Sequence, residues 1–249
     1  QTEPPFDDIN VRRAMHIGTN FERFKEFGDA QDFPTHVYPA WSGNASVYTP
    51  IDQLPAEVKE LYEYDPDKAK KMLADAGYPN GFEMDYFTSN DGVMPDLAAL
   101  VQSEYAKIGV KVNIESMDYV TYRNYRDTFT YEDSIICGTE VGNAVGSVTN
   151  LLRTDAWLNY AKFSNSEVDR LATEIEAELD FTKQNELIRQ AAVAAAKEVS
   201  SIGLYLVPRG MFWWPWLQNY YGEVSIEDGT FGGLVPYIWI DQNMKKEMG

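Results

Sequence analysis

The chain has 249 residues, of which 44% are hydrophobic and 14% aromatic, so it can bury a substantial core in one large α/β domain or in two smaller domains. Its 21 basic and 39 acidic residues give a formal net charge of −18, which repels phosphate backbones and anionic membrane surfaces. This composition argues against a disordered chain and against nucleic acid as a partner, and the charge favours a soluble monomer.

Residue types that form disulfides and metal sites are scarce. Cys137 is the only cysteine, which excludes an internal disulfide and a cysteine-based zinc site. His16 and His36 are too few and too scattered for a metal site, and we expect them to have plain polar roles. No apolar run is long enough to span a membrane, and no signal-peptide pattern opens the chain. The first residue, Gln1, is not an initiator methionine, so we expect a mature or shortened chain.

The N-terminal segment predicts one short helix followed by a loop. Prolines extend residues 2–6, and Asp7 or Asp8 then caps a helix over residues 11–17. Residues 33–55 contain prolines and aromatic side chains without a steady period, which indicates a long ordered loop.

The next segment predicts a capped helix and a strand. Asp65 is the expected N-cap, Pro66 the first helical residue and Gly77 the stop. After a turn at residues 79–81, apolar and acidic side chains alternate over residues 82–86, as in a half-buried strand.

Two further helices and strands follow in alternation. A helix over residues 97–108 precedes a strand over 110–114, and a helix that begins at Asp118 precedes a buried strand over 134–137. Strands separated by single helices predict parallel pairing, and such sheets bind ligands beyond the carboxyl ends of their strands. Residues 138–146 lie at such an end.

The last third of the chain predicts a pair of helices and an aromatic cluster. Ser164 and Glu167 form the pattern of a capping box before a helix over residues 168–179, and a second helix is expected over 182–199. A strand over residues 202–206 then leads into the densest aromatic cluster of the chain, which includes Trp213, Trp214 and Trp216.

Several stretches of the chain, in this order, resemble a known family. They are Pro5-Phe6-Asp7-Asp8 with Val11-Arg12-Arg13-Ala14, Tyr64-Asp65-Pro66-Asp67-Lys68-Ala69-Lys70-Lys71-Met72-Leu73, Ala76-Gly77-Tyr78-Pro79-Asn80-Gly81-Phe82, Ile108-Gly109-Val110, and Asn159-Tyr160 with Ser164-Asn165-Ser166-Glu167-Val168-Asp169. The chain resembles the extracellular solute-binding proteins of oligopeptide, dipeptide and nickel importers. The similarity spans nearly the whole chain.

The resemblance implies that the chain is the C-terminal half of a longer, two-lobed protein. Residues 1–221 would form the distal lobe, an α/β fold of the periplasmic-binding-protein type with a central mixed sheet flanked by helices. Residues 2–6 would leave an interlobe hinge, and residues 222–249 would return to the missing N-terminal lobe.

The resemblance also implies a binding protein rather than an enzyme, without a cofactor. The two lobes would enclose a small-molecule solute, and the closed form would dock on the permease of an ABC transporter. The parent protein would be exported, either to a periplasm or to the cell surface with a lipid anchor.

The peptide binders of that family carry a Gly-Trp-x-Ala-Asp pattern, in which the aspartate pairs with the terminal ammonium of a peptide. The matching stretch here is Gly138-Thr139-Glu140-Val141-Gly142, so Thr139 replaces the tryptophan and Gly142 replaces the aspartate. Glu140 is either a substitute for that aspartate or an acid that faces solvent.

Several tryptophans and polar residues lead to a second ligand hypothesis, an oligosaccharide. Sugar rings stack on indole, and their hydroxyls bond to planar polar groups. The candidate residues are Trp41, Trp157, Trp213, Trp214, Asn143, Asn159 and Arg209. The alternative is that these tryptophans pack in the core or against the missing lobe, and that Arg209 forms a surface salt bridge. The hypothesis fails if the indoles are buried away from any cleft.

An enzyme is the alternative class of function. Glu140 and Asp155 are acids of the kind that act as paired carboxylates in glycoside hydrolases. No Walker-type glycine-rich loop and no Gly-x-Ser-x-Gly elbow occurs, so nucleotide hydrolysis and serine-triad chemistry have no support.

Overall fold

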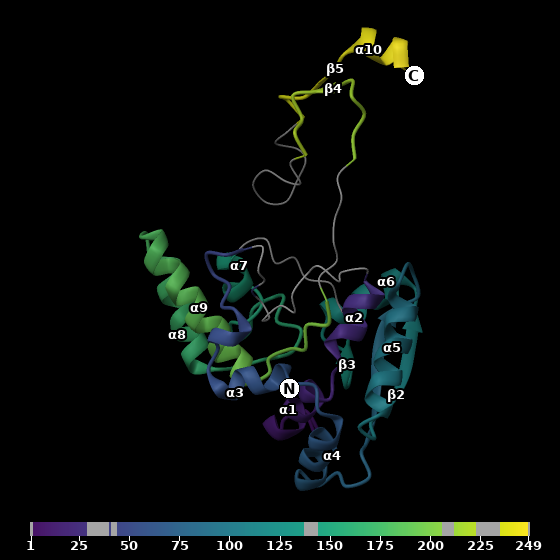
Figure 1. Cartoon of the computed structure of the whole chain (residues 1–249), viewed down its shortest axis with the longest axis vertical. Coiled ribbons are helices and arrows are strands. Elements are labelled where there is room, and N and C mark those ends of the chain that lie inside the picture. Colours follow the sequence, from purple (N-terminus) through teal and green to yellow (C-terminus); the bar gives the residue numbers. More distant parts are fainter. Residues whose placement is uncertain are drawn as a thin grey trace. The chain divides into compact units, whose positions relative to one another are not determined.

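The chain divides into two compact units, which we call unit 1 (Gln1–Leu206) and unit 2 (Val207–Gly249) (Figure 1). The structure is a computed structural model, and it describes residues 2–28, 40, 44–136, 144–205, 212–222 and 235–248. Unit 1 contains a parallel sheet and most of the described helices, whereas unit 2 contains a short antiparallel strand pair and one described helix.

The first predicted helix is confirmed as α1 (Ile9–Ile17). Asp8 is its N-cap, and the Asp8 carboxylate accepts a hydrogen bond of 2.7 Å from the backbone N–H of Asn10. The next helix, α2 (Phe21–Phe27), was not predicted from the sequence. His16 of α1 is buried, and its Nδ1 lies 2.9 Å from the carbonyl oxygen of Leu61, so this histidine has a structural role.

The predicted loop over residues 33–55 is described only in part. Residues 33–39 and 41–43 lie outside the described residues. From residue 44 the chain forms a turn and then three short helical segments: η1 (Ile51–Gln53), α3 (Ala56–Lys59) and η2 (Glu60–Tyr62).

The second predicted helix is confirmed as α4 (Pro66–Asp75). Asp65 caps it by accepting a hydrogen bond of 2.9 Å from the backbone N–H of Lys68, and Pro66 occupies the first turn, where its missing N–H leaves no bond unmade. Gly77 follows with a φ of +98°, the left-handed conformation that ends many helices.

The central sheet of unit 1 has the strand order β2-β1-β3, and both pairings are parallel. Its strands are β1 (Glu83–Ser89), β2 (Lys111–Met117) and β3 (Ser134–Ile135), connected by α5 (Met94–Ala106) and α6 (Tyr119–Asp127). The predicted alternation and parallel pairing are therefore confirmed. The third strand is shorter than the predicted 134–137 and only half-buried.

Helices cover both faces of this sheet. Met84 and Tyr86 point to one face, where they join a core with Val101 and Tyr105 of α5. Phe87 points to the other face and stacks on Tyr125 of α6, with 5.7 Å between ring centroids.

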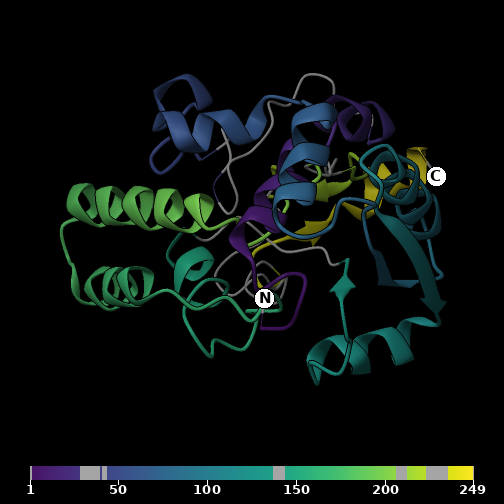
Figure 2. The ribbon, with the colours of Figure 1, turned by 90° about the horizontal axis from the view of Figure 1, so that it is seen from below.

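The other part of unit 1 is helical and has its own core. It comprises α7 (Ala144–Thr149), α8 (Ser166–Ala177) and α9 (Phe181–Lys197), and α8 and α9 form an antiparallel hairpin to one side of the sheet (Figure 2). The predicted Ser164 capping box is wrong. The N-cap of α8 is Asn165, because its side-chain oxygen reaches the first turn and accepts bonds from the N–H groups of Glu167 and Val168.

The strand predicted over residues 202–206 is also wrong, since residues 201–205 form no strand. Ile202 and Leu204 instead pack against the core of the sheet. The alternating pattern of this segment arises because one of its sides packs on the core. Residues 201–205 do not pair with a neighbouring strand.

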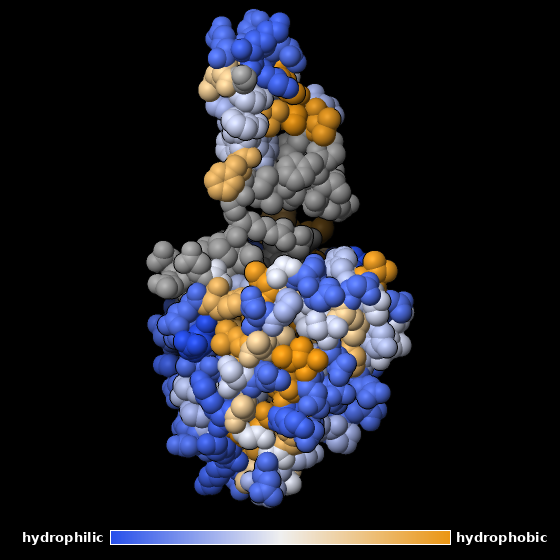
Figure 3. Space-filling view, turned by 90° about the vertical axis from the view of Figure 1, so that its right-hand side faces the viewer, coloured by the Kyte–Doolittle hydropathy of each residue, from blue (hydrophilic) through white to orange (hydrophobic). Residues whose placement is uncertain are grey.

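Unit 2 pairs β4 (Leu217–Gln218) with β5 (Trp239–Ile240) and ends in α10 (Gln242–Met248). Among its described residues only Tyr220 is a buried hydrophobic residue. On the face shown in Figure 3, hydrophilic residues surround the apolar ones of unit 1, and apolar residues also lie exposed on unit 2. The described residues of unit 2 therefore bury little apolar surface among themselves.

Candidate functional site

The carboxyl edge of the parallel sheet is the best candidate for a binding site in unit 1. β1 and β2 end in register at Ser89 and Met117, and the backbone N–H of Asn90 extends the pairing with a 2.7 Å bond to the Met117 carbonyl. Polar residues follow directly: Asn90 and Asp91 after β1, and Asp118 after β2. Open parallel sheets bind ligands beyond this edge because the connecting loops leave a crevice there.

Two polar side chains at the end of β1 are buried. Thr88 is satisfied locally, since its hydroxyl donates to the carbonyl oxygen of Ser89 at 3.2 Å. Ser89 is 3% exposed, and its hydroxyl has no hydrogen-bond partner among the residues that the structure describes. Leaving a buried hydroxyl without a partner costs about 1–3 kcal/mol, so a water or a ligand bound here would relieve that cost. Ser89 was not among the residues predicted from the sequence, because its burial is known only from the structure.

Asp118 shapes this edge as the N-cap of α6. Its carboxylate accepts a 2.6 Å bond from the Thr121 hydroxyl and two 3.1 Å bonds from the N–H groups of Val120 and Thr121. These bonds, with the Thr121 hydroxyl contributing most, hold the pKa of Asp118 below its usual value. The edge therefore keeps a negative charge at neutral pH.

A cluster around Tyr122 fixes the end of β3. The Tyr122 hydroxyl donates a 2.5 Å bond to the carbonyl of Ile136, the last described residue before the gap at 137–143. The Arg126 guanidinium lies 5.8 Å from the ring centroid of Tyr122 and 5.0 Å from that of Tyr160. Its hydrogen bond lowers the pKa of Asp127. This cluster ties α6 to the loop that carries Trp157 and Asn159.

Of the predicted binding residues, Asn159 and Trp157 belong to one loop but differ in environment. Asn159 is 3% exposed; its amide nitrogen donates to the carbonyls of Arg153 and Phe163, and its oxygen accepts from the Phe163 N–H at 2.9 Å. A ligand would have to displace one of these bonds. Trp157 is 70% exposed, so its indole is accessible for stacking.

Trp213 and Trp214 are both exposed and belong to unit 2. Trp213 packs edge-on against Tyr220, and Trp214 stacks on Trp216 with 4.6 Å between ring centroids. Part of the surface of each indole is therefore already occupied.

Most of the other predicted site residues lie outside the described residues. These are Trp41, Thr139, Glu140, Asn143 and Arg209. His36 and Cys137 lie outside them as well. Asp155 is described and exposed, whereas Glu140, its hypothetical catalytic partner, belongs to the part of the chain that is not described.

The described residues offer no metal centre, since they contain no group of three histidine, cysteine, aspartate or glutamate residues suited to hold an ion. Within the same ranges, no helix combines the length and the apolar character that a membrane span requires.

This fold places the chain among the lobes of periplasmic binding proteins. The structure of the Escherichia coli murein tripeptide binding protein MppA matches with a TM-score of 0.72 at 20% identity, over 88% of this chain and 43% of that one. At this identity the match establishes the fold, and the predicted fold class is confirmed.

The chain belongs to the bacterial extracellular solute-binding proteins, family 5, whose middle region matches residues 1–139. Heme-binding protein A of Haemophilus influenzae is 27% identical over 215 residues, which cover 76% of this chain and 35% of that protein. The periplasmic oligopeptide-binding protein OppA of Salmonella typhimurium is 25% identical over 235 residues, 90% of this chain and 41% of that protein. The resemblance seen in the sequence is thereby confirmed.

The chain thus spans less than half the length of these two curated relatives. Both relatives are named as binding proteins, and the family is one of solute-binding proteins, which gives no support to the glycoside hydrolase hypothesis.

Proposed function

We propose that this chain is the distal lobe of the solute-binding component of an ABC importer, which captures a small molecule between two lobes and delivers it to a membrane permease. The observation that carries the proposal is the polar carboxyl edge of the sheet, where the buried Ser89 hydroxyl lacks a partner among the described residues. Affinity would come from apolar burial together with a few placed polar groups. The parent protein would be exported, to a periplasm or to the cell surface with a lipid anchor.

The contacts of Arg12 support an interlobe hinge beside α1. Its Nη1 donates to the carbonyls of Phe6 and Asp7 at 2.8 and 3.1 Å, and its Nε donates to the carbonyl of Glu198 at 3.0 Å. Burial lowers the pKa of this guanidinium, although nearby carboxylates oppose the effect. Arg12 therefore holds the N-terminal segment, where the hinge is proposed, against the residue that follows α9. Arg12 belongs to the stretch Val11-Arg12-Arg13-Ala14, which is part of the resemblance to the family.

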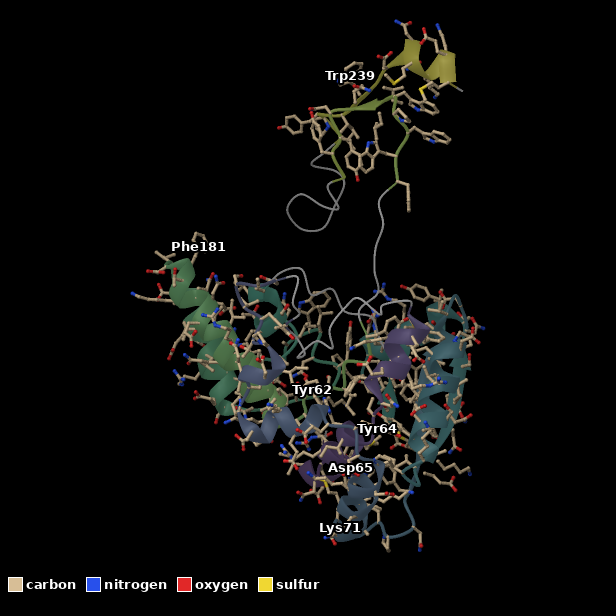
Figure 4. The ribbon with its side chains drawn as sticks, in the orientation of Figure 1. Tyr62, Tyr64, Asp65, Lys71, Phe181 and Trp239 are labelled. Atoms are coloured by element: carbon tan, nitrogen blue, oxygen red, sulfur yellow. The ribbon has the colours of Figure 1, made fainter. Side chains whose placement is uncertain are left out.

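The exposed apolar residues of unit 2 support the assignment of residues 222–249 to the missing first lobe, with residues 1–221 in the distal lobe. Trp239 and Ile240 are exposed in a strand pair too small to bury them, and Tyr237 is exposed in the turn before β5. Figure 4 labels Trp239 on this pair. A surface of this kind would be covered by the rest of the parent protein.

A short peptide or peptide-like molecule is our first candidate for the solute, because OppA and MppA are named for peptide ligands. The heme named in the other relative argues that the family accommodates different chemistries. An oligosaccharide is the second candidate, favoured by the exposed indole of Trp157.

A thermal-shift screen of the full-length parent protein against short peptides, oligosaccharides and nickel chelates tests this function. A ligand that binds only the native state raises the melting temperature by mass action. At a free ligand concentration of 100 times Kd, the free energy of unfolding increases by about 2.7 kcal/mol. We expect stabilisation by peptides. Stabilisation by oligosaccharides alone would replace the first candidate with the second, and no stabilisation by any solute class would argue against the proposed function.

A further inference from the structure

The free end of the α8–α9 hairpin presents two large apolar side chains to solvent. Leu179 is 91% exposed and Phe181 is 79% exposed, and only Asp180 separates them. Figure 4 shows Phe181 at the outer end of α9. We call residues 178–181 the hairpin tip.

The hairpin tip is held rigidly. Asp180 caps α9 by accepting bonds from the N–H groups of Thr182 and Lys183 at 2.9 and 3.2 Å. The amide of Gln184 donates to the carbonyls of Ile175 and Glu178, which ties the start of α9 to the end of α8. A rigid support lowers the entropy cost of binding, so the two apolar side chains suit a protein interface.

A hollow lies beside the tip and adds shape to this surface. It has a volume of about 720 Å³ and is lined by residues of both helices, including Ala177, Leu187 and Lys183. The tip can thus insert apolar side chains into a partner while the hollow receives one in return.

The surroundings of the tip are acidic. Residues 174–186 contain five acids against one lysine; the acids are Glu174, Glu176, Glu178, Asp180 and Glu186. Glu174, Glu176 and Glu186 pair with arginines (Arg170, Arg153 and Arg189), whereas Glu178 and Asp180 have no cationic partner within the described ranges. A partner with lysine or arginine around an apolar pocket would complement this charge.

Charge argues against two other occupants. A second copy would bring the same acidic tip and a net charge of −18, and an anionic lipid surface would also be repelled. The missing first lobe is the remaining alternative, and the solute affinity of the variant below tests it.

We propose that the hairpin tip docks on the membrane permease, by inserting Leu179 and Phe181 into an apolar pocket with a basic rim. This inference rests on the proposed function. It adds the surface through which the loaded protein is recognised.

The test uses the full-length protein and its cognate importer reconstituted in nanodiscs, with ATP hydrolysis and binding affinity as readouts. We expect Leu179→Ser/Phe181→Ser to weaken the affinity for the importer about tenfold or more, as for interface hot spots, and to leave the Kd for solute unchanged. Tyr64→Ser is the matched control, since Tyr64 is an exposed aromatic residue well away from the tip (Figure 4).

A charge variant, Glu178→Gln/Asp180→Asn, separates the basic rim from the apolar pocket, and asparagine preserves the helix cap. We expect this variant to weaken binding at low salt and to reduce its salt dependence, in contrast to the control Asp67→Asn/Asp75→Asn on α4. If the Leu179/Phe181 variant stimulated ATP hydrolysis by the importer as strongly as the wild-type protein does, the inference would be overturned. A loss of solute affinity in this variant would also overturn it, because that loss would place the tip against the first lobe. Failure of the wild-type protein to bind any solute would instead refute the proposed function.

Discussion

The 249-residue chain alone is expected to bind the solute of its parent protein about 100-fold more weakly than the full-length protein does, or not detectably. The reason is geometric. A two-lobed binding protein buries most of its ligand between the lobes, and one lobe supplies polar and apolar contacts on one side only. Ser89 and the residues beyond β1 would contact a solute that stays exposed to water on its opposite side.

Isothermal titration of the same solute into both proteins measures this difference. Circular dichroism of the isolated chain serves as a control, because an unfolded chain would also fail to bind. Equal dissociation constants for the two proteins would show that the distal lobe holds the complete site, and the two-lobed account would then be wrong.

Gly81→Ala is expected to destabilise unit 1 by about 3 kcal/mol, the largest effect that we predict for a single substitution. Gly81 has a φ of +74°, which is strained for alanine, and an added Cβ would lie 1.8 Å from the carbonyl oxygen of Gly109. The two glycines precede the paired strands β1 and β2, so neither backbone can withdraw without disturbing the register.

Gly77→Ala is the matched control. Gly77 also has a positive φ, +98°, but a Cβ added there would meet no atom within 4 Å, so this variant should lose only about 1 kcal/mol. Urea denaturation of the wild type and both variants gives the comparison. Similar losses of unfolding free energy in the two variants would mean that the contact of the added Cβ with the Gly109 carbonyl costs nothing beyond the strained φ.

The local elements of the sheet were predictable because each has a short-range signal. Asp65 and Pro66 mark the start of α4, and alternating apolar residues mark β1 and β2. Parallel pairing followed from the single helices between strands. These signals agree with one another, which is why the fold class could be predicted.

Elements determined by tertiary contacts were missed or misplaced. α2 and α7 are short and have no distinctive pattern, and residues 201–205 alternate like a strand but pack on the core without a partner strand. The cap of α8 is Asn165 rather than Ser164, a shift of one residue that lies within the usual uncertainty of helix boundaries.

The candidate site was only partly predictable. The sequence pointed to the carboxyl ends of the strands but not to Ser89, because a serine inside a strand looks ordinary until its burial is known. Tryptophans drew attention by their size, yet Trp157 and Trp214 belong to different units. Spacing in the sequence does not reveal which exposed indoles share a surface.

Small-angle X-ray scattering of the full-length parent protein, with and without the solute found by the thermal-shift screen, tests the central claim most directly. If the two lobes close around the solute, the radius of gyration decreases at saturating solute and returns to the open value when the solute is removed. A saturated protein whose radius of gyration is unchanged would contradict capture by closure of the lobes.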